Sequence, residues 1–327
     1  MKQPVLTVSV APFWHSGAGI ARNSYFTMMA LLPAAFIGVL HYGIGALAVL
    51  CLSIASCMAA EALMQKIMGR PVTLADGSAA LTGMLLALLL PAGVPWWLVV
   101  VGALCAIILG KQIFGGLGSN PMNATLVGWI ILRISWAIHM DPDVALINLS
   151  NLTGLSTIAA LRGGYGQTLQ LSDIWMGNVV GPIGSASLAV LLGGLALVVM
   201  HLVFKIRLIK WEVSISFLAG ALVGALTFGS MILPEGAAGT ISSGNLALLM
   251  LFSGPIMLGA FFLAPDSSSS PSQPIGMAIF GFCAGLLAIL IRVKGFYYDA
   301  GVAFAILLMN LVYPLLDKIR PQARGKE

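Results

Sequence analysis

Long apolar runs, separated by short groups of glycine, proline and charged residues, recur along the whole chain. Many approach the roughly 20 residues that an α-helix needs to cross about 30 Å of hydrocarbon. The pattern predicts about ten transmembrane helices, near residues 24–42, 44–64, 77–90, 96–109, 122–138, 185–204, 213–233, 244–263, 275–291 and 301–316. We therefore expect an all-α polytopic membrane protein.

Composition supports a lipid environment. Hydrophobic residues make up 59% of the 327 residues and charged residues only 8%, against roughly 25% charged residues in a soluble domain. The lipid bilayer is therefore an expected partner, and no nucleic acid is. The segment Met1–Val10 holds one lysine and no short apolar stretch with a small-residue cleavage site, so no removable signal peptide is expected.

The basic residues predict the orientation. With ten spans, four of the 16 Lys and Arg residues, Arg133, Arg162, Arg292 and Lys294, fall on one side, and the other twelve fall on the side of both termini. Because basic residues concentrate in cytoplasmic loops, both termini are predicted to lie in the cytoplasm and the protein in the cytoplasmic (inner) membrane.

The same topology divides the chain into two sets of five spans, residues 1–138 and 185–327, joined by an outer loop over 139–184. This loop is rich in Asn, Ser, Thr and Gly. A connection of such length often carries function, although its composition fits a passive loop equally well.

The two sets share a feature in their third spans, which begin alike at Asp76-Gly77-Ser78 and Ser243-Gly244-Asn245. A repeated unit of five spans has inverted topology, because an odd number of crossings reverses the second copy. The third span is also short, ending before Pro91, which predicts a half-helix inside the protein. The alternative is an ordinary tilted helix preceded by a turn.

Few polar residues in the spans suggest chemistry. Glu61 is the carboxylate deepest in an apolar run and is a functional candidate for that reason, although its position near the cytoplasmic end weakens the case. Asp76 can cap the third span or help to bind an ion or cofactor at its start. The four cysteines and four histidines show no metal-ligand spacing, so neither a metal site nor a catalytic group is predicted. A transporter or channel fits these residues as well as an electron-transfer protein does.

Several longer stretches resemble one family. They are Asp76–Ala87 with Leu90-Pro91 and Pro95-Trp96-Trp97, Gly110–Asn123, Gly259–Phe262 continuing through Asp266 to Pro271, and Phe304–Asn310 with Pro314 and Asp317. They are similar to the family of membrane proteins that contains the D subunit of Rnf electron-transport complexes and the B subunit of the sodium-pumping NADH:quinone reductase.

The resemblance implies a urea-transporter-like fold and a place beside other Rnf complex subunits. It also implies a non-catalytic electron-transfer role in a complex that couples electron flow between ferredoxin and NAD to Na⁺ or H⁺ translocation. Family members carry FMN on a threonine of an S/T-G-A-T motif in the outer loop, and some are reported with riboflavin. The alternatives are a stand-alone transporter or channel of similar fold, and a flavin-less scaffold.

The expected flavin motif is altered in this chain. Its best match is Thr153-Gly154-Leu155-Ser156, with Leu for Ala and Ser for the acceptor Thr. Serine offers the same hydroxyl chemistry, so the resemblance places FMN on Ser156, or on Thr157 after a shift of one residue, with Thr153 and Gly154 shaping the loop.

Overall fold

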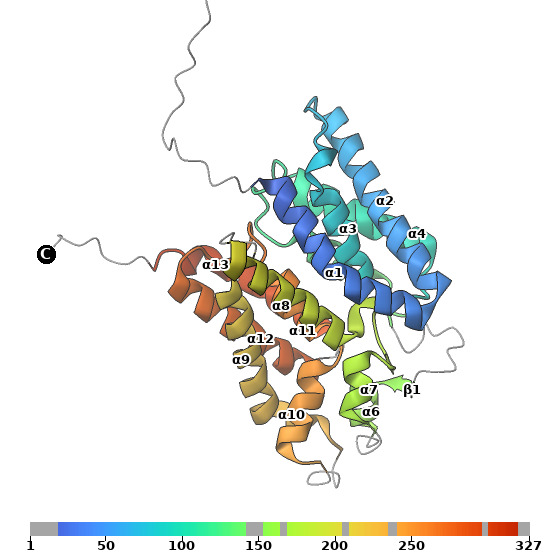
Figure 1. Cartoon of the computed structure of the whole chain (residues 1–327), viewed down its shortest axis with the longest axis vertical. Coiled ribbons are helices and arrows are strands. Elements are labelled where there is room, and N and C mark those ends of the chain that lie inside the picture. Colours follow the sequence, from blue (N-terminus) through green and yellow to red (C-terminus); the bar gives the residue numbers. More distant parts are fainter. Residues whose placement is uncertain are drawn as a thin grey trace, which may run out of the picture.

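The protein is almost entirely helical in the computed structural model, which describes residues 19–141, 153–163, 169–204, 209–234, 241–295 and 300–319. Helices occupy all ten segments that the hydropathy pattern predicts. Figure 1 shows the two halves of the chain side by side, with the first half in blue to green and the second in yellow to red.

The first half consists of helices that end where proline or glycine interrupts the apolar pattern. They are α1 (Ile20–Tyr42), α2 (Ile44–Ile67), the 3₁₀ turn η1 (Leu74–Asp76), α3 (Ser78–Leu89), α4 (Trp96–Leu104) with its π-helical continuation η2 (Cys105–Gln112), and α5 (Ala124–Ser135). The third helix ends at Leu89 because Leu90 precedes Pro91 and takes an extended conformation. At that end, the Trp129 indole donates to the Leu89 carbonyl over 2.9 Å.

The second half has a comparable series. It contains α8 (Ser187–Phe204), α9 (Trp211–Phe228) continued by η5 (Gly229–Ile232), α10 (Ser243–Phe252), α11 (Ile256–Leu258) continued by the π-helical η6 (Gly259–Leu263), α12 (Pro274–Lys294) and α13 (Gly301–Leu316).

The segment predicted as one continuous span over 244–263 is broken instead. It bends by 66° between α10 and α11. Gly254 lies there with a φ of 63°, and Pro255 has no amide hydrogen for the helix ladder. The Arg292 guanidinium donates to the Met250 carbonyl over 3.0 Å beside the break. Each half therefore has a short helix followed by a π-helical segment, with a side chain from another helix bound to the end of the short one.

The connection between the two halves adds a small feature that the all-α prediction omits. Between the halves lie β1 (Thr153–Ser156), α6 (Thr157–Arg162), α7 (Leu171–Met176), β2 (Val179–Val180) and η4 (Ile183–Ser185). The two strands pair in parallel, with Thr153 opposite Val179 and Ser156 opposite Val180. The Arg162 guanidinium donates to the carbonyls of Arg292 and Val293, which anchors α6 on the C-terminal end of α12.

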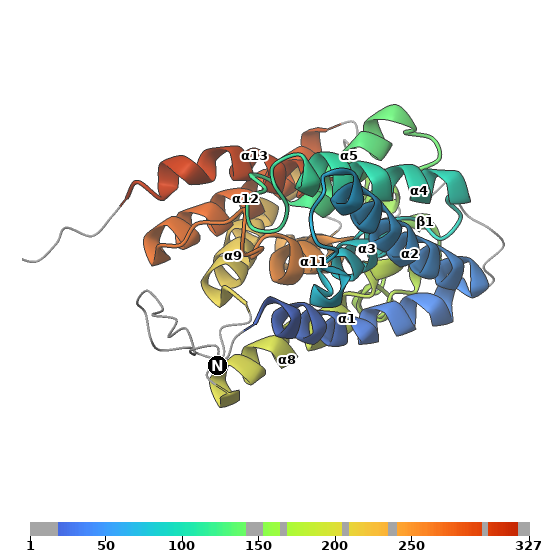
Figure 2. The same ribbon diagram turned by 90° about the horizontal axis from the view of Figure 1, so that it is seen from above.

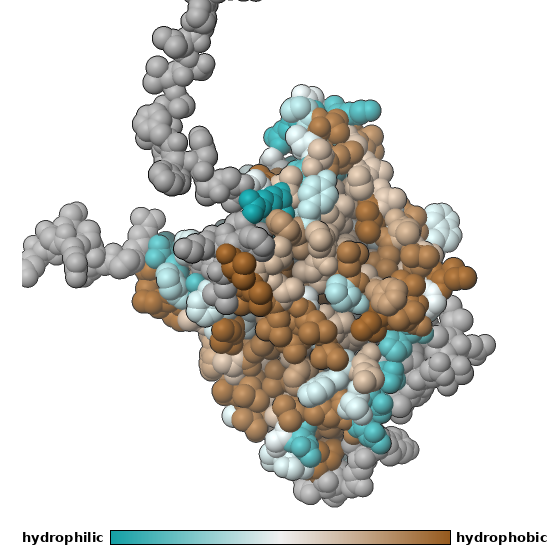
Figure 3. Space-filling model, viewed as in Figure 1, coloured by the Kyte–Doolittle hydropathy of each residue, from teal (hydrophilic) through white to brown (hydrophobic). Residues whose placement is uncertain are grey.

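Lengths and hydropathies indicate a multi-pass membrane protein. Within the described residues, four helices are long and apolar enough to cross a membrane, and the bent pair α10–η6 is a fifth candidate. The other predicted spans are apolar helices of 10–17 residues, so the number of crossings stays a prediction. Figure 3 shows hydrophobic residues over most of one face, with hydrophilic ones gathered toward its upper and lower edges.

Glycines allow the closest helix contacts. A Cβ on Gly220 of α9 would overlap the Phe282 carbonyl, and one on Gly285 of α12 would overlap the Phe217 carbonyl. Small residues allow such close approach of helices in a membrane. A Cβ on Gly193 of α8 would likewise overlap the Ala30 carbonyl of α1, while Gly38 near the other end of α1 meets Ile183 just before α8. The two helices are therefore antiparallel, and Figure 2 shows them side by side. An inverted repeat requires its two first spans to run in opposite directions.

Candidate functional site

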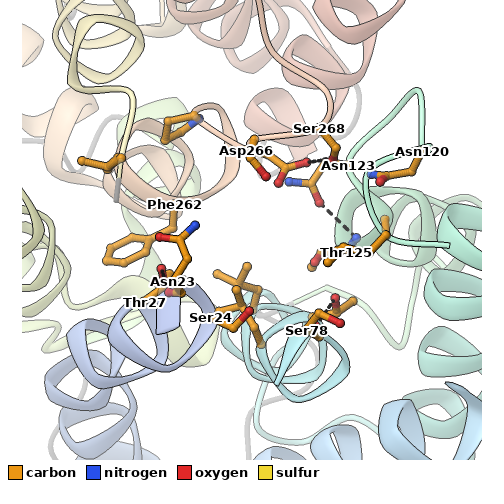
Figure 4. Close-up of a pocket in the computed structure, with 18 of the residues that line it drawn as sticks. Asn23, Ser24, Thr27, Ser78, Asn120, Asn123, Thr125, Phe262, Asp266 and Ser268 are labelled. Atoms are coloured by element: carbon orange, nitrogen blue, oxygen red, sulfur yellow. Dashed lines mark hydrogen bonds between the residues drawn. The ribbon is translucent and has the colours of Figure 1, made fainter. Parts of the chain in front are cut away.

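A cavity of about 630 Å³ lies between the two halves of the chain. Its walls come from α1, α3, the turn between η2 and α5, η6 and the turn that follows η6. Figure 4 shows polar side chains from these elements surrounding one space. The labelled wall residues are Asn23, Ser24, Thr27, Ser78, Asn120, Asn123, Thr125, Phe262, Asp266 and Ser268.

Amide side chains fix the wall where the two halves meet. Asn123 precedes α5, and its side-chain oxygen accepts from the Thr125 amide over 3.0 Å. Its side-chain nitrogen donates to the Leu263 carbonyl at the end of η6, over 3.1 Å. The Asn310 side-chain amide of α13 is assigned the orientation that satisfies its neighbours. Its oxygen then accepts from the Asn123 backbone amide, and its nitrogen donates to the Ser269 carbonyl, each over 3.0 Å. These bonds hold the turn before α5 against the turn that follows η6.

The cavity presents both polar and aromatic groups to a ligand. Asn23 of α1 lines it, and the buried Asn23 side-chain oxygen has no hydrogen-bond partner among the described residues. Buried polar atoms are rarely left unpaired. Phe261 and Phe262 of η6 line the same space and are both buried. The wall therefore suits a ligand that combines a flat apolar surface with hydrogen-bonding groups.

A buried ion pair forms part of one wall, which Lys111 lines. The Lys111 ammonium at the end of η2 donates to both Glu61 carboxylate oxygens, over 2.7 and 2.8 Å, and to the Ser78 hydroxyl over 2.7 Å. The Gln112 side-chain amide also donates to Glu61, over 3.1 Å. Only 3% of the lysine side chain and 2% of the glutamate side chain are exposed. The charge pattern predicts Lys111 as one of the cytoplasmic loop charges, and the structure instead buries it as the partner of Glu61.

Asp76 joins this network at the start of α3. One carboxylate oxygen accepts from the Ser78 backbone amide over 2.9 Å and from the Ser78 hydroxyl over 2.8 Å. Asp76 thus has the capping role that its position predicted. It contacts Ser78, which lines the cavity, but Asp76 itself is not among the described lining residues.

The turn after η6 forms the facing wall. The Asp266 carboxylate accepts from the hydroxyls of Ser268 and Ser269. The Lys210 ammonium, just before α9, donates to the Ser270 carbonyl over 2.9 Å and to its hydroxyl over 2.8 Å. These contacts give the serine-rich turn a defined shape next to the cavity.

The predicted FMN residues lie elsewhere. Ser156 and Thr157 occupy the junction between β1 and α6, with 8% and 5% of their surfaces exposed. The Ser156 hydroxyl accepts from the Ala159 amide over 3.3 Å and so caps α6. Thr153 and Gly154 form the strand before it. Figure 1 places this junction beside α6 and α7, far from the end of α2 that leads toward Asp76, so the predicted site residues form two groups rather than one.

The cavity wall brings together residues that sequence reasoning did not select. Asn23, Asn123 and Lys111 come from different elements of the first half, and Phe262 comes from the second. Two weak signals were present: Asn123 belongs to a stretch that carries the family resemblance, and Glu61 is an intramembrane acid that requires a cationic or hydrogen-bonding partner.

Comparison with known proteins gives one consistent result. A model of the NQR2, RnfD, RnfE family matches residues 7–325. The chain is 36% identical to the D subunit of the Na(+)-translocating ferredoxin:NAD(+) oxidoreductase complex of Acetobacterium woodii, covering 97% of this chain and 94% of the relative. It is 33% identical to the D subunit of the proton-translocating ferredoxin:NAD(+) oxidoreductase complex of Clostridium ljungdahlii, with coverages of 97% and 95%. Identity to the D subunit of the ion-translocating oxidoreductase complex of Haemophilus influenzae is also 33%, over 96% of each chain.

Proposed function

Because the chain belongs to the NQR2, RnfD, RnfE family, we propose that it is the D-type membrane component of an Rnf-type complex. In this proposal the complex couples electron transfer between ferredoxin and NAD to the translocation of Na⁺ or H⁺, and its other subunits are the partners of this chain. The names of two similar relatives specify different ions, Na⁺ in one and protons in the other. Family membership therefore leaves the ion open.

The cavity is the observation that supports a cofactor-carrying role for this chain. Its volume of about 630 Å³ lies within the roughly 300–1,000 Å³ typical of pockets for small ligands and cofactors. Phe261 and Phe262 offer apolar surface to a ring system, while Asn23 and the hydroxyls of α1 offer hydrogen bonds. These groups fit an uncharged flavin, and we assign riboflavin to this cavity. Bound flavin would supply one-electron chemistry, and the chain would bind and orient it and exclude water.

The second proposed cofactor is FMN at the β1–α6 junction, in the predicted outer loop. A phosphate ester on Ser156 or Thr157 would lie at the first turn of α6. The folded junction must change before FMN can be attached, because both residues are buried and the Ser156 hydroxyl already caps the helix. Attachment at either residue therefore requires the β1–α6 junction to open before the hydroxyl can react.

The experiment that tests these assignments starts from the complex purified through this chain. In-gel fluorescence of the denatured chain reports covalent flavin, and mass analysis of the tryptic peptide over residues 134–162 locates it. We expect one FMN adduct, lost in Ser156→Ala if Ser156 is the acceptor and lost in Thr157→Ala if Thr157 is. Riboflavin, the flavin that lacks the phosphate of FMN, would be the cavity ligand if denaturation releases it.

The outcomes separate the alternatives. A dark band with an unmodified peptide would overturn covalent attachment, and absence of released riboflavin would overturn the cavity assignment. Absence of both, with the other subunits still co-purifying, would leave a scaffold role. Purification without redox proteins, together with solute flux by the isolated chain, would favour the stand-alone transporter or channel.

A further inference from the structure

The buried Lys111–Glu61 ion pair turns one of its two ends toward the cavity. Lys111 lines the cavity, whereas Glu61 is not among the described lining residues. The Lys111 ammonium donates to Glu61 on one side and to Ser78, another lining residue, on the other. The pair therefore presents its cationic end to the cavity and its anionic end to the interior of the first half.

Other charges at the cavity act more weakly. Lys210 and Asp266 also line it, and the Asp76 carboxylate lies one hydrogen bond beyond Ser78. All three residues are partly exposed, so water and salt screen their charges. The Lys111 side chain is only 3% exposed, and a charge in such a low-dielectric site acts over several ångströms with little screening. Among these charges, the ammonium of the buried pair is therefore the least screened one at the cavity.

We propose that the orientation of the Lys111–Glu61 pair raises the reduction potential of the cofactor in the cavity. This inference rests on the proposed function, since it requires a redox-active ligand there. An electron that enters such a ligand adds one negative charge unless a proton follows. The cationic end of the pair stabilises that added charge, so Lys111 acts electrostatically and Glu61 acts as the residue that positions it.

The test compares variants that change the charges while preserving the shape of the site. Glu61→Gln/Lys111→Met replaces the pair by neutral side chains of similar size, a change that proteins often tolerate. Glu61→Lys/Lys111→Glu keeps an ion pair but turns its anionic end toward the cavity. Lys66→Gln is the control, because it removes an exposed cation from the last turn of α2, at the same end of the molecule. Each is made in the full-length chain with Ser156→Ala and Thr157→Ala, which removes covalent flavin.

Added riboflavin is the probe, and an electrode delivers the electrons while absorbance reports the oxidised fraction. At fixed potential, we expect the reduced-to-oxidised ratio of bound riboflavin to fall by about tenfold in the neutral variant. It should fall further in the reversed variant and remain unchanged in Lys66→Gln. A structural role alone gives no reason for this order. If the reversed variant does not fold, the neutral variant still decides.

The results distinguish two kinds of failure. Bound riboflavin with an unchanged ratio in the neutral variant, or a higher ratio in the reversed one, would overturn this inference and leave the cavity assignment intact. If the chain with an intact ion pair binds no riboflavin, the cavity assignment fails, and this inference fails with it.

Discussion

Glu61 and Lys111 show how a membrane protein can keep charges inside its apolar interior. Removing each charge from water costs several kcal/mol, which only close pairing and additional hydrogen bonds offset. Both carboxylate oxygens accept from the ammonium, and Gln65 and Gln112 donate to the same carboxylate. Ser78 takes a further ammonium hydrogen. Such complete pairing predicts that the two charges are interdependent.

Breaking the pair on one side should therefore destabilise the chain more than removing both charges. Glu61→Gln or Lys111→Met alone leaves an unpaired buried group and should cost about 3–5 kcal/mol. Glu61→Gln/Lys111→Met should cost clearly less. Denaturation of the purified chain in detergent measures this, and a double variant as unstable as the sum of the single variants would contradict the interdependence.

Asn23 gives a prediction about the cavity ligand. Its side-chain amide lines the cavity and can hydrogen-bond the ligand, so Asn23→Leu should weaken riboflavin binding by about tenfold, the value of one hydrogen bond to a buried group. Thr227→Val, on an exposed part of α9 away from the cavity, serves as the control. Flavin fluorescence during titration gives both affinities. Equal affinities would show that Asn23 does not contact riboflavin.

At the scale of elements, glycine and proline determine where helices end and how closely they approach. Pro91 and Pro255 interrupt two apolar segments in comparable places, and each short helix is followed by a π-helical segment that leads to a cavity-lining turn. π-Helical segments are frequent at functional sites. Close approach of α9 and α12 depends on glycines whose missing side chains leave room for a neighbouring backbone.

This dependence predicts a contrast between two glycines. Gly220→Ala would place a methyl group against the Phe282 carbonyl and should destabilise the chain by about 1–3 kcal/mol, as overpacking usually does. Gly244→Ala in α10 is the matched control, because a Cβ there meets nothing within 4 Å. Thermal unfolding in detergent compares them, and equal stability of the two variants would contradict the proposed packing.

At the scale of the whole molecule, the two ends differ in chemistry. Arg162, Arg292 and Lys294 lie together at the end that carries α6, while the cavity network lies toward the end formed by the last turns of α2. The antiparallel packing of α1 and α8 agrees with an inverted repeat, which stays a prediction together with the number of crossings and the orientation.

Orientation can be measured directly with exposed positions at the two ends. In a chain whose four natural cysteines are replaced, Ser172→Cys at the predicted outer end should react with a membrane-impermeant thiol reagent added to intact cells. Both positions are exposed in the structure, so each can react once the reagent reaches it. Val72→Cys lies at the predicted cytoplasmic end and should therefore react only after lysis. The opposite result would reverse the topology.

The sequence alone determined the helical segments, their apolar character and the family. Long apolar runs require a lipid environment whatever their partners are, and the motifs at Asp76–Ala87 and Gly110–Asn123 carry the resemblance directly. The prediction missed the bend at Gly254 and the β1–β2 pair, because length and hydropathy cannot distinguish a broken span from a straight one or detect a two-stranded contact.

Only the tertiary structure showed which polar residues meet. Lys111 is 50 positions from Glu61, and Asn123 binds Leu263 across 140 positions. Such partners are chosen by how the helices pack and by the high cost of leaving a polar group unpaired in an apolar interior, and no local period of the sequence records that choice. The cavity between the two halves, and the direction of the charge pair beside it, exist only once those helices are assembled.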